Sequence, residues 1–144
     1  MIVSSMVMIL VSVSCGKDDP KPKVDEVEAT VEALSNKPWT PTGVTFANAN
    51  VDTDWSNFVL SFDDSKGYTA SALSNESVLV WPASGTYTFP NANDPNTILR
   101  DDGVLISIQS LTETSTLLVF TITGRNEDTR TEGLLGKWEF ELGN

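Results

Sequence analysis

The chain has 144 residues, enough for one domain with one hydrophobic core. Its 20 acidic and 9 basic residues give a formal net charge of −11, which opposes binding to nucleic acids and to an anionic membrane surface. Histidine is absent and Cys15 is the single cysteine. An intrachain disulfide, a Ser-His-Asp triad, a Cys-His pair and a zinc site of the usual ligands are therefore excluded.

Residues 1–14 form an uncharged, mostly apolar segment that ends in small residues. The segment is too short to span a bilayer and has the character of a secretory signal. Val13-Ser14-Cys15-Gly16 resembles the lipobox of bacterial lipoproteins, a family in which the signal peptide is cleaved before the cysteine and the cysteine is lipidated. The resemblance implies a lipid anchor at Cys15 and a location at the outer membrane of the cell.

A tether follows the cysteine. Lys17-Asp18-Asp19 resembles the surface-export signal of some Gram-negative lipoproteins, but charge beside Pro20 and Pro22 is equally typical of a solvated linker. Residues 24–34 place valine and leucine at helical spacing, with acidic residues in the first turn. We therefore expect residues 15–33 to form a lipidated tether and a short helix.

From Trp39 onward the chain consists of short runs with the period-2 alternation of β-strands. Short, turn-rich connections favour antiparallel pairing. The expected strands are residues 42–46, 57–62, 68–72, 78–81 as a lead-in broken at Pro82, 85–89, 98–100, 104–108, 116–123 and 136–142. Residues 34–144 are thus predicted to form an all-β domain, an antiparallel up-and-down barrel or strongly curled sheet of about eight strands, after a short N-terminal helix.

The alternation assigns one set of bulky residues to a single face of the predicted sheet. The set comprises Phe58, Leu60, Phe62, Tyr87, Phe89, Val104, Ile106, Ile108, Leu118, Phe120, Ile122, Trp138, Phe140 and Leu142. A slip of one residue would expose all of them, so the strand register is well specified. An eight-stranded barrel with this lining is expected to be largely filled, with at most a small pocket at one mouth.

The sharpest turn is expected at Asp102-Gly103. An Asp-Gly pair between two strand-like runs predicts a hairpin with a type I′ turn, because that turn needs positive φ at both central residues.

Five segments resemble the lipocalin-like (calycin-type) domains of small bacterial lipoproteins of unknown function. They are residues 34–39 (LSNKPW), 58–62 (FVLSF), 81–89 (WPASGTYTF), 98–103 (ILRDDG) and 136–140 (GKWEF). The resemblance covers about residues 34–144 and implies a β-barrel and a cell-envelope compartment, rather than an activity.

Few side chains remain as candidates for a site. Trp55 and Trp81 border polar loops and could form stacking platforms for a ligand, or could cap the barrel ends. The pairs Asp63-Asp64 and Asp101-Asp102 could serve carboxylate catalysis, but acids in turns more often set backbone geometry and solubility. Residues 48–54 offer oxygen side chains at every second position, yet they depart from the EF-hand pattern and are better interpreted as a polar loop.

Three functions remain open. The first is a lipid-anchored outer-membrane or surface lipoprotein whose barrel binds a small apolar or carbohydrate ligand. The second is a non-enzymatic module with a filled barrel that contacts a protein partner through its loops. The third and least favoured is a carboxylate-dependent hydrolase. We predict a protein without enzymatic activity, cofactor, metal or nucleic-acid partner. The size of the cavity distinguishes the first two functions, because a ligand-binding barrel needs a cavity and an interaction module with a filled barrel does not.

Overall fold

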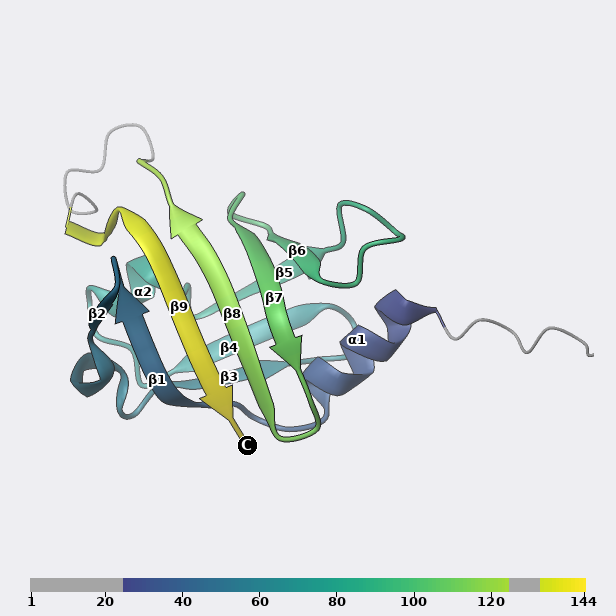
Figure 1. Cartoon of the computed structure of the whole chain (residues 1–144), viewed down its shortest axis with the longest axis horizontal. Helices are drawn as coiled ribbons and strands as arrows, with labels where there is room; N and C mark the ends of the chain where they lie inside the picture. The colour runs from purple at the N-terminus through teal and green to yellow at the C-terminus, as the bar shows by residue number, and fades with distance from the viewer. Residues whose placement is uncertain (1–24, 125–132) are drawn as a thin grey trace, which may run out of the picture.

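A computed structural model describes residues 25–124 and 133–144 and contains one nine-stranded antiparallel sheet. The elements are α1 (Glu26–Ser35), β1 (Thr40–Phe46), β2 (Ala49–Asn50), the 3-10 helix η1 (Asp52–Trp55), β3 (Val59–Phe62), β4 (Gly67–Ser71), α2 (Ser77–Val80), β5 (Ser84–Thr88), β6 (Thr97–Arg100), β7 (Leu105–Leu111), β8 (Ser115–Ile122) and β9 (Gly136–Gly143). The strands lie in the order β2-β1-β9-β8-β7-β6-β5-β4-β3 (Figure 1). This arrangement confirms the all-β class, the short helix and the curled sheet, whereas a closed barrel is not formed.

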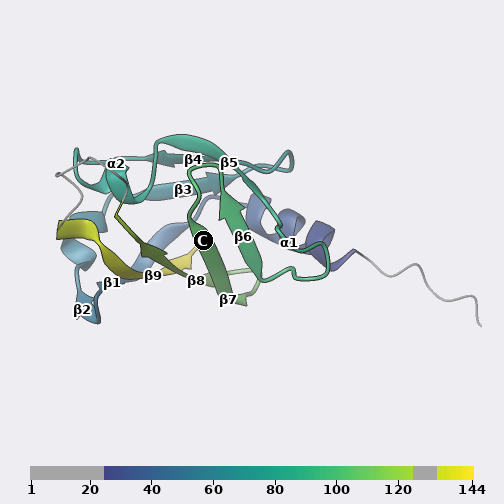
Figure 2. The ribbon, with the colours of Figure 1, turned by 90° about the horizontal axis from the view of Figure 1, so that it is seen from above.

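The curled sheet forms two layers (Figure 2). β3, β4 and β5 lie in one layer, and β1, β9, β8 and β7 lie in the other. α1 lies at one end of the molecule, between the layers, and α2 lies at the opposite end.

The curled sheet is open, and Trp39, just before β1, links the β1 end of the sheet to β3 at one point. Its backbone N–H donates to the Leu60 carbonyl at 2.8 Å and its carbonyl accepts from the Leu60 N–H at 2.9 Å, which makes an isolated bridge just before β1. Its indole N–H donates to the Leu34 carbonyl in α1 at 2.8 Å. This one buried residue therefore fixes α1, the start of β1 and β3 relative to one another.

Aromatic side chains fill the space between the layers. Every residue predicted for the apolar face is buried except Phe89, which is partly buried and packs against the core. Phe120 stacks on Phe140 with 5.6 Å between ring centroids, and Trp81 meets both rings edge-on. Rings at these separations are in contact, so the centre of the curled sheet is packed with side chains.

Arg100 is the one charged residue within this core, among the residues that the structure describes. Its Nε donates to Asp102 Oδ1 at 3.0 Å, Nη2 donates to Asp102 Oδ2 at 2.5 Å, and Nη1 donates to the Val80 carbonyl at 2.8 Å. The guanidinium also lies 4.9 Å from the ring centroid of Trp81 and 5.6 Å from that of Phe120. The buried cation is thus both paired and covered by aromatic rings.

The predicted type I′ turn at Asp102-Gly103 is wrong. The Gly103 N–H donates to the Arg100 carbonyl and the Arg100 N–H to the Val104 carbonyl, which closes a three-residue loop. Gly103 has φ of +89°, but Asp102 is not among the residues with positive φ. This is the hairpin loop that ends in a left-handed glycine and a bulge, and it leaves the Asp102 carboxylate directed at Arg100.

Two other local predictions need correction. Residues 78–81 do not form a lead-in strand, because residues 77–80 form the helical turn α2. The two-residue turn with positive φ at both positions lies at Ala47 (49°) and Asn48 (67°), where it joins β1 to the two-residue strand β2, which was not predicted.

Replacing Phe120 by Ala is expected to lower the free energy of unfolding by about 3–5 kcal/mol, the usual loss for a buried aromatic side chain. Denaturant unfolding followed by tryptophan fluorescence measures this loss. Thr121→Ala, at the exposed neighbouring position of β8, is the control and should cost at most about 1 kcal/mol. A loss below about 1 kcal/mol for Phe120→Ala would show that the interior is not packed around this ring.

Replacing Arg100 by Lys is expected to destabilise the fold by about 2–3 kcal/mol although the charge is kept. A lysine cannot make the two-pronged contact with Asp102, reach the Val80 carbonyl and lie flat against two rings. The matched control is the reverse exchange at an exposed site, Lys37→Arg, which should change stability by less than about 0.5 kcal/mol. Equal melting temperatures for Arg100→Lys and the wild type would contradict the role given to the guanidinium.

Candidate functional site

A pocket of about 470 Å³ opens at the α2 end of the molecule. Its lining combines aromatic and aliphatic side chains with small polar ones: Trp55, Ser74, Asn75, Glu76, Ser77, Val80, Leu134 and Trp138. These residues come from η1, from the segment that leads into α2, from α2 itself, from β9 and from the residues just before β9. A concave site with apolar walls and a few polar groups is the usual form of a small-ligand site.

Trp55 forms part of the pocket wall and part of the core. Its ring meets Phe58, Trp138 and Phe140 edge-on, with centroid separations of 5.1, 5.7 and 4.7 Å. Only 3% of Trp55 is exposed, so the ring offers the pocket a limited apolar area. The sequence-based prediction of Trp55 as a ligand-binding residue stays a prediction, now with a pocket beside it.

The first residue of η1, Asp52, links this element to β1 and β2. Asp52 Oδ1 accepts from the Val44 N–H at 2.6 Å, and Asp52 Oδ2 accepts from Asn50 Nδ2 at 2.7 Å. These bonds lower the pKa of the Asp52 carboxyl, the backbone bond from Val44 having the larger effect. The oxygen side chains of residues 48–54 thus include two that stabilise the loop, in line with its interpretation as a polar loop.

Trp138 forms a second aromatic wall. Its indole N–H donates to the Leu134 carbonyl at 3.0 Å, and its ring stacks on Phe46 with a centroid separation of 4.5 Å. The sequence analysis assigned Trp138 to the core and did not predict a pocket there. The burial of Trp138 agrees with its assignment to the core. Its contact with Leu134 also makes it part of the pocket wall.

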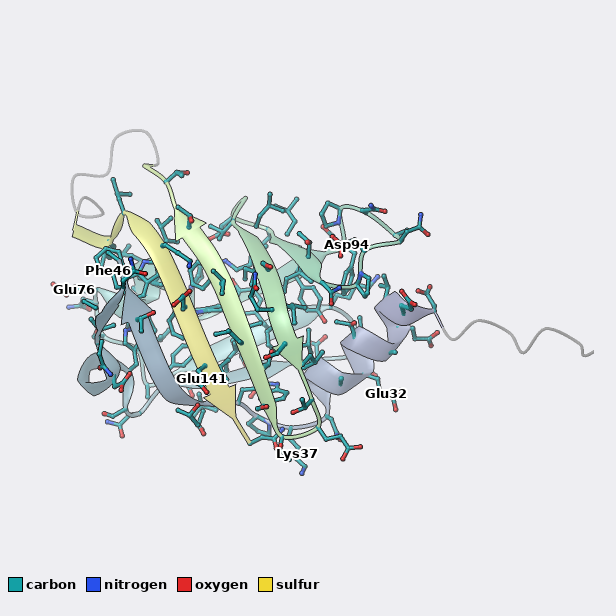
Figure 3. The ribbon with its side chains drawn as sticks, viewed as in Figure 1. Glu32, Lys37, Phe46, Glu76, Asp94 and Glu141 are labelled. Carbon is teal, nitrogen blue, oxygen red and sulfur yellow. The ribbon has the colours of Figure 1, made fainter. Side chains whose placement is uncertain are left out.

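Serine side chains shape the polar side of the pocket. Ser74 Oγ accepts from the Ser77 N–H at 3.1 Å, and Ser77 Oγ accepts from the Ser74 N–H at 2.6 Å. These reciprocal bonds cap the first turn of α2 and occupy both hydroxyls. Asn75 and Glu76 are exposed, and Glu76 lies at the same end of the molecule as Phe46 (Figure 3).

The structure does not bring Trp81 to this pocket. Trp81 has no exposed area and packs against Phe58, Tyr68 and Phe120 in the core. Its indole Nε1 has no hydrogen-bond partner among the described residues. Trp55 and Trp81 therefore do not form one platform, and of the two only Trp55 lines the pocket.

The acidic turn residues serve the hairpins that contain them. Asp63 Oδ1 accepts from the Ser65 and Gly67 N–H groups at 2.8 Å, and Asp101 Oδ2 accepts from the Thr86 N–H at 3.1 Å. Asp102 binds Arg100.

The phenol of Tyr87 lies buried near Asp63. Burial, with a smaller effect from the Asp63 charge, raises the pKa of Tyr87 to about 12, so this phenol stays protonated at neutral pH.

A second hollow of similar volume, about 470 Å³, lies beside the β6–β7 hairpin and the end of β8. Its lining includes Asp102, Leu105 and Phe120, but Asp102 already binds Arg100. Its lining holds no tryptophan, whereas the lining of the pocket beside α2 holds two. The pocket beside α2 is therefore the better candidate site.

The described residues offer neither a metal site nor a membrane-spanning helix. No group of three or more His, Cys, Asp or Glu side chains in residues 25–124 and 133–144 is placed to hold a metal ion. Within the same ranges, no helix has the length and apolar character needed to cross a membrane. Cys15 and the predicted signal peptide, residues 1–14, lie outside the described residues.

The chain matches no protein-family model and no curated protein sequence.

Proposed function

We propose that the protein is an outer-membrane lipoprotein, anchored through Cys15, whose lipocalin-like domain binds a small carbohydrate in the pocket beside α2. The observation that carries the ligand class is the lining of this pocket, which sets two indole rings beside an exposed amide and an exposed carboxylate. Sugars present apolar C–H faces and many hydroxyl groups, so they suit such a mixed lining.

The position of the pocket supports a tethered binding protein. α1 lies at the end of the domain opposite α2 (Figure 1). The predicted tether directly precedes α1 in the sequence. An anchor at Cys15 would therefore attach the domain at the α1 end and leave the pocket facing away from the membrane. This orientation suits a ligand that arrives from the surrounding medium.

The packed interior favours one alternative, a non-enzymatic interaction module that contacts a protein partner through its loops. A centre filled by rings such as Phe120 and Phe140 leaves no room for a large internal ligand. Carbohydrate binding nevertheless remains the first proposal, because a pocket at the mouth does not require an empty interior. The hydrolase alternative gains no support from the Asp63 and Asp101 contacts.

Lipidation is tested by replacing Cys15 with Ala in the full chain in a Gram-negative host. The wild type is expected in the membrane fraction and to incorporate labelled palmitate, because two or more acyl chains make anchoring stable. Cys15→Ala should lose the label and leave the membrane fraction. Unchanged labelling and fractionation of the variant would refute the anchor.

Carbohydrate binding is tested by titrating the soluble domain with maltose, cellobiose and lactose while recording tryptophan fluorescence. At least one sugar is expected to give a saturable change, because Trp55 and Trp138 line the pocket. Asn75→Ala should weaken this binding about 5- to 10-fold, the effect of one lost hydrogen bond. Asn93→Ala, the same change in the exposed β5–β6 loop, is the matched control and should bind like the wild type.

An uncharged apolar fluorescent probe, N-phenyl-1-naphthylamine, separates the alternatives in the same assay. Saturable binding of this probe without any response to sugars would favour an apolar ligand. A response to neither class of ligand would favour the interaction module.

A further inference from the structure

We infer that the pocket beside α2 selects neutral or cationic sugars against anionic ones, and that the Glu76 carboxylate sets this preference. The inference rests on the proposed carbohydrate site and adds the charge class of its ligand. It starts from the pocket lining, in which Glu76 is the one charged side chain among the residues that the structure describes.

The cations of the described residues lie elsewhere or are already paired. Arg100 is buried and bound to Asp102. Lys137 precedes Trp138 but points to the opposite face of β9, where its Nζ lies 2.7 Å from Glu139 Oε1. Neither cation lines the pocket, so an anionic ligand would meet Glu76 without a compensating positive charge among the lining residues.

Glu76 is free to interact with a ligand. It occupies the N-cap position of α2, but its side chain makes no capping hydrogen bond, because Ser74 and Ser77 satisfy the backbone of that turn. It is also exposed, so its carboxylate reaches solvent at the rim of the pocket. Replacing it by Gln removes the charge and leaves the cap and the shape of the pocket in place.

The field of the whole domain acts in the same direction. The chain has a formal net charge of −11, so an anionic ligand is repelled before it reaches the pocket. This long-range contribution is screened beyond about 10 Å at 0.1 M salt. The contribution of Glu76 acts at close range, so the two can be separated by ionic strength and by mutation.

The test uses two matched sets of sugars that differ in charge: glucose, glucosamine and glucuronate, and galactose, galactosamine and galacturonate. Dissociation constants are measured at pH 7 in 20 and 300 mM salt, from tryptophan fluorescence and from the indole N–H resonances in NMR spectra. In the better-bound set, the amino sugar is expected to bind about 3- to 5-fold more tightly than the uronate at low salt, the range of an exposed charge pair. Glu76→Gln should reduce this ratio to less than about 2-fold, because the charge that discriminates between the two sugars is removed.

Glu32→Gln is the matched control. It makes the same change of charge on α1, at the opposite end of the molecule from Glu76 (Figure 3), and should keep the wild-type ratio. Equal binding of all three sugars, tighter binding of the uronate, or an unchanged ratio in Glu76→Gln would overturn the inference while leaving the carbohydrate site intact. No binding of any sugar in either set would overturn the carbohydrate site, and the inference with it.

Discussion

The burial of one arginine constrains the centre of this domain. A guanidinium with 1% of its surface exposed has lost its hydration, and that loss is compensated only if its donors and its flat faces all find partners. Asp102 supplies the counter-charge from the β6–β7 loop, and the Val80 carbonyl supplies an acceptor from α2. Trp81 and Phe120 cover the cation from two further segments. The loop, the helical turn and the aromatic core therefore have to form together.

This constraint also explains where a ligand can bind. Trp81 lies in contact with Arg100 and with the surrounding rings, so it serves the interior and not a binding surface. Val80, the residue before it, has its carbonyl bound to Arg100 and its side chain in the wall of the pocket. The packed centre thus forms the floor of the pocket beside α2. The space for a ligand lies above this floor, at the mouth of the curled sheet.

The sequence predicted the strands well because their period-2 pattern reports burial directly. Residues such as Leu118, Phe120 and Ile122 lie inward, as the alternation required. It failed at residues 78–81, because a short apolar run fits a strand or a helix equally and the Ser74–Ser77 bonds decide the outcome. The prediction of a type I′ turn at Asp102 was also wrong, because the conformation of this loop depends on a contact with Arg100 inside the fold.

The candidate site was harder to predict than the fold. Trp55 was identified from its polar surroundings, but Asn75, Leu134 and Trp138 come from separate segments that meet only when the sheet curls. No local pattern carries that information. Trp81 has surroundings in the sequence similar to those of Trp55, yet tertiary packing places the two rings in different environments.

The pairing of β1 with β9 sets the order in which the domain can assemble. β3 to β8 pair with neighbours along the chain, whereas the Thr40 hydroxyl in β1 contacts the Gly143 carbonyl in β9 across 103 positions. Closing so long a loop costs entropy before any contact repays it, and such topologies fold slowly. During synthesis, at about 5–20 residues per second, β1 has no long-range partner until β9 emerges. The edge of the sheet that contains β1 therefore cannot be completed until the last strand of the chain has been made.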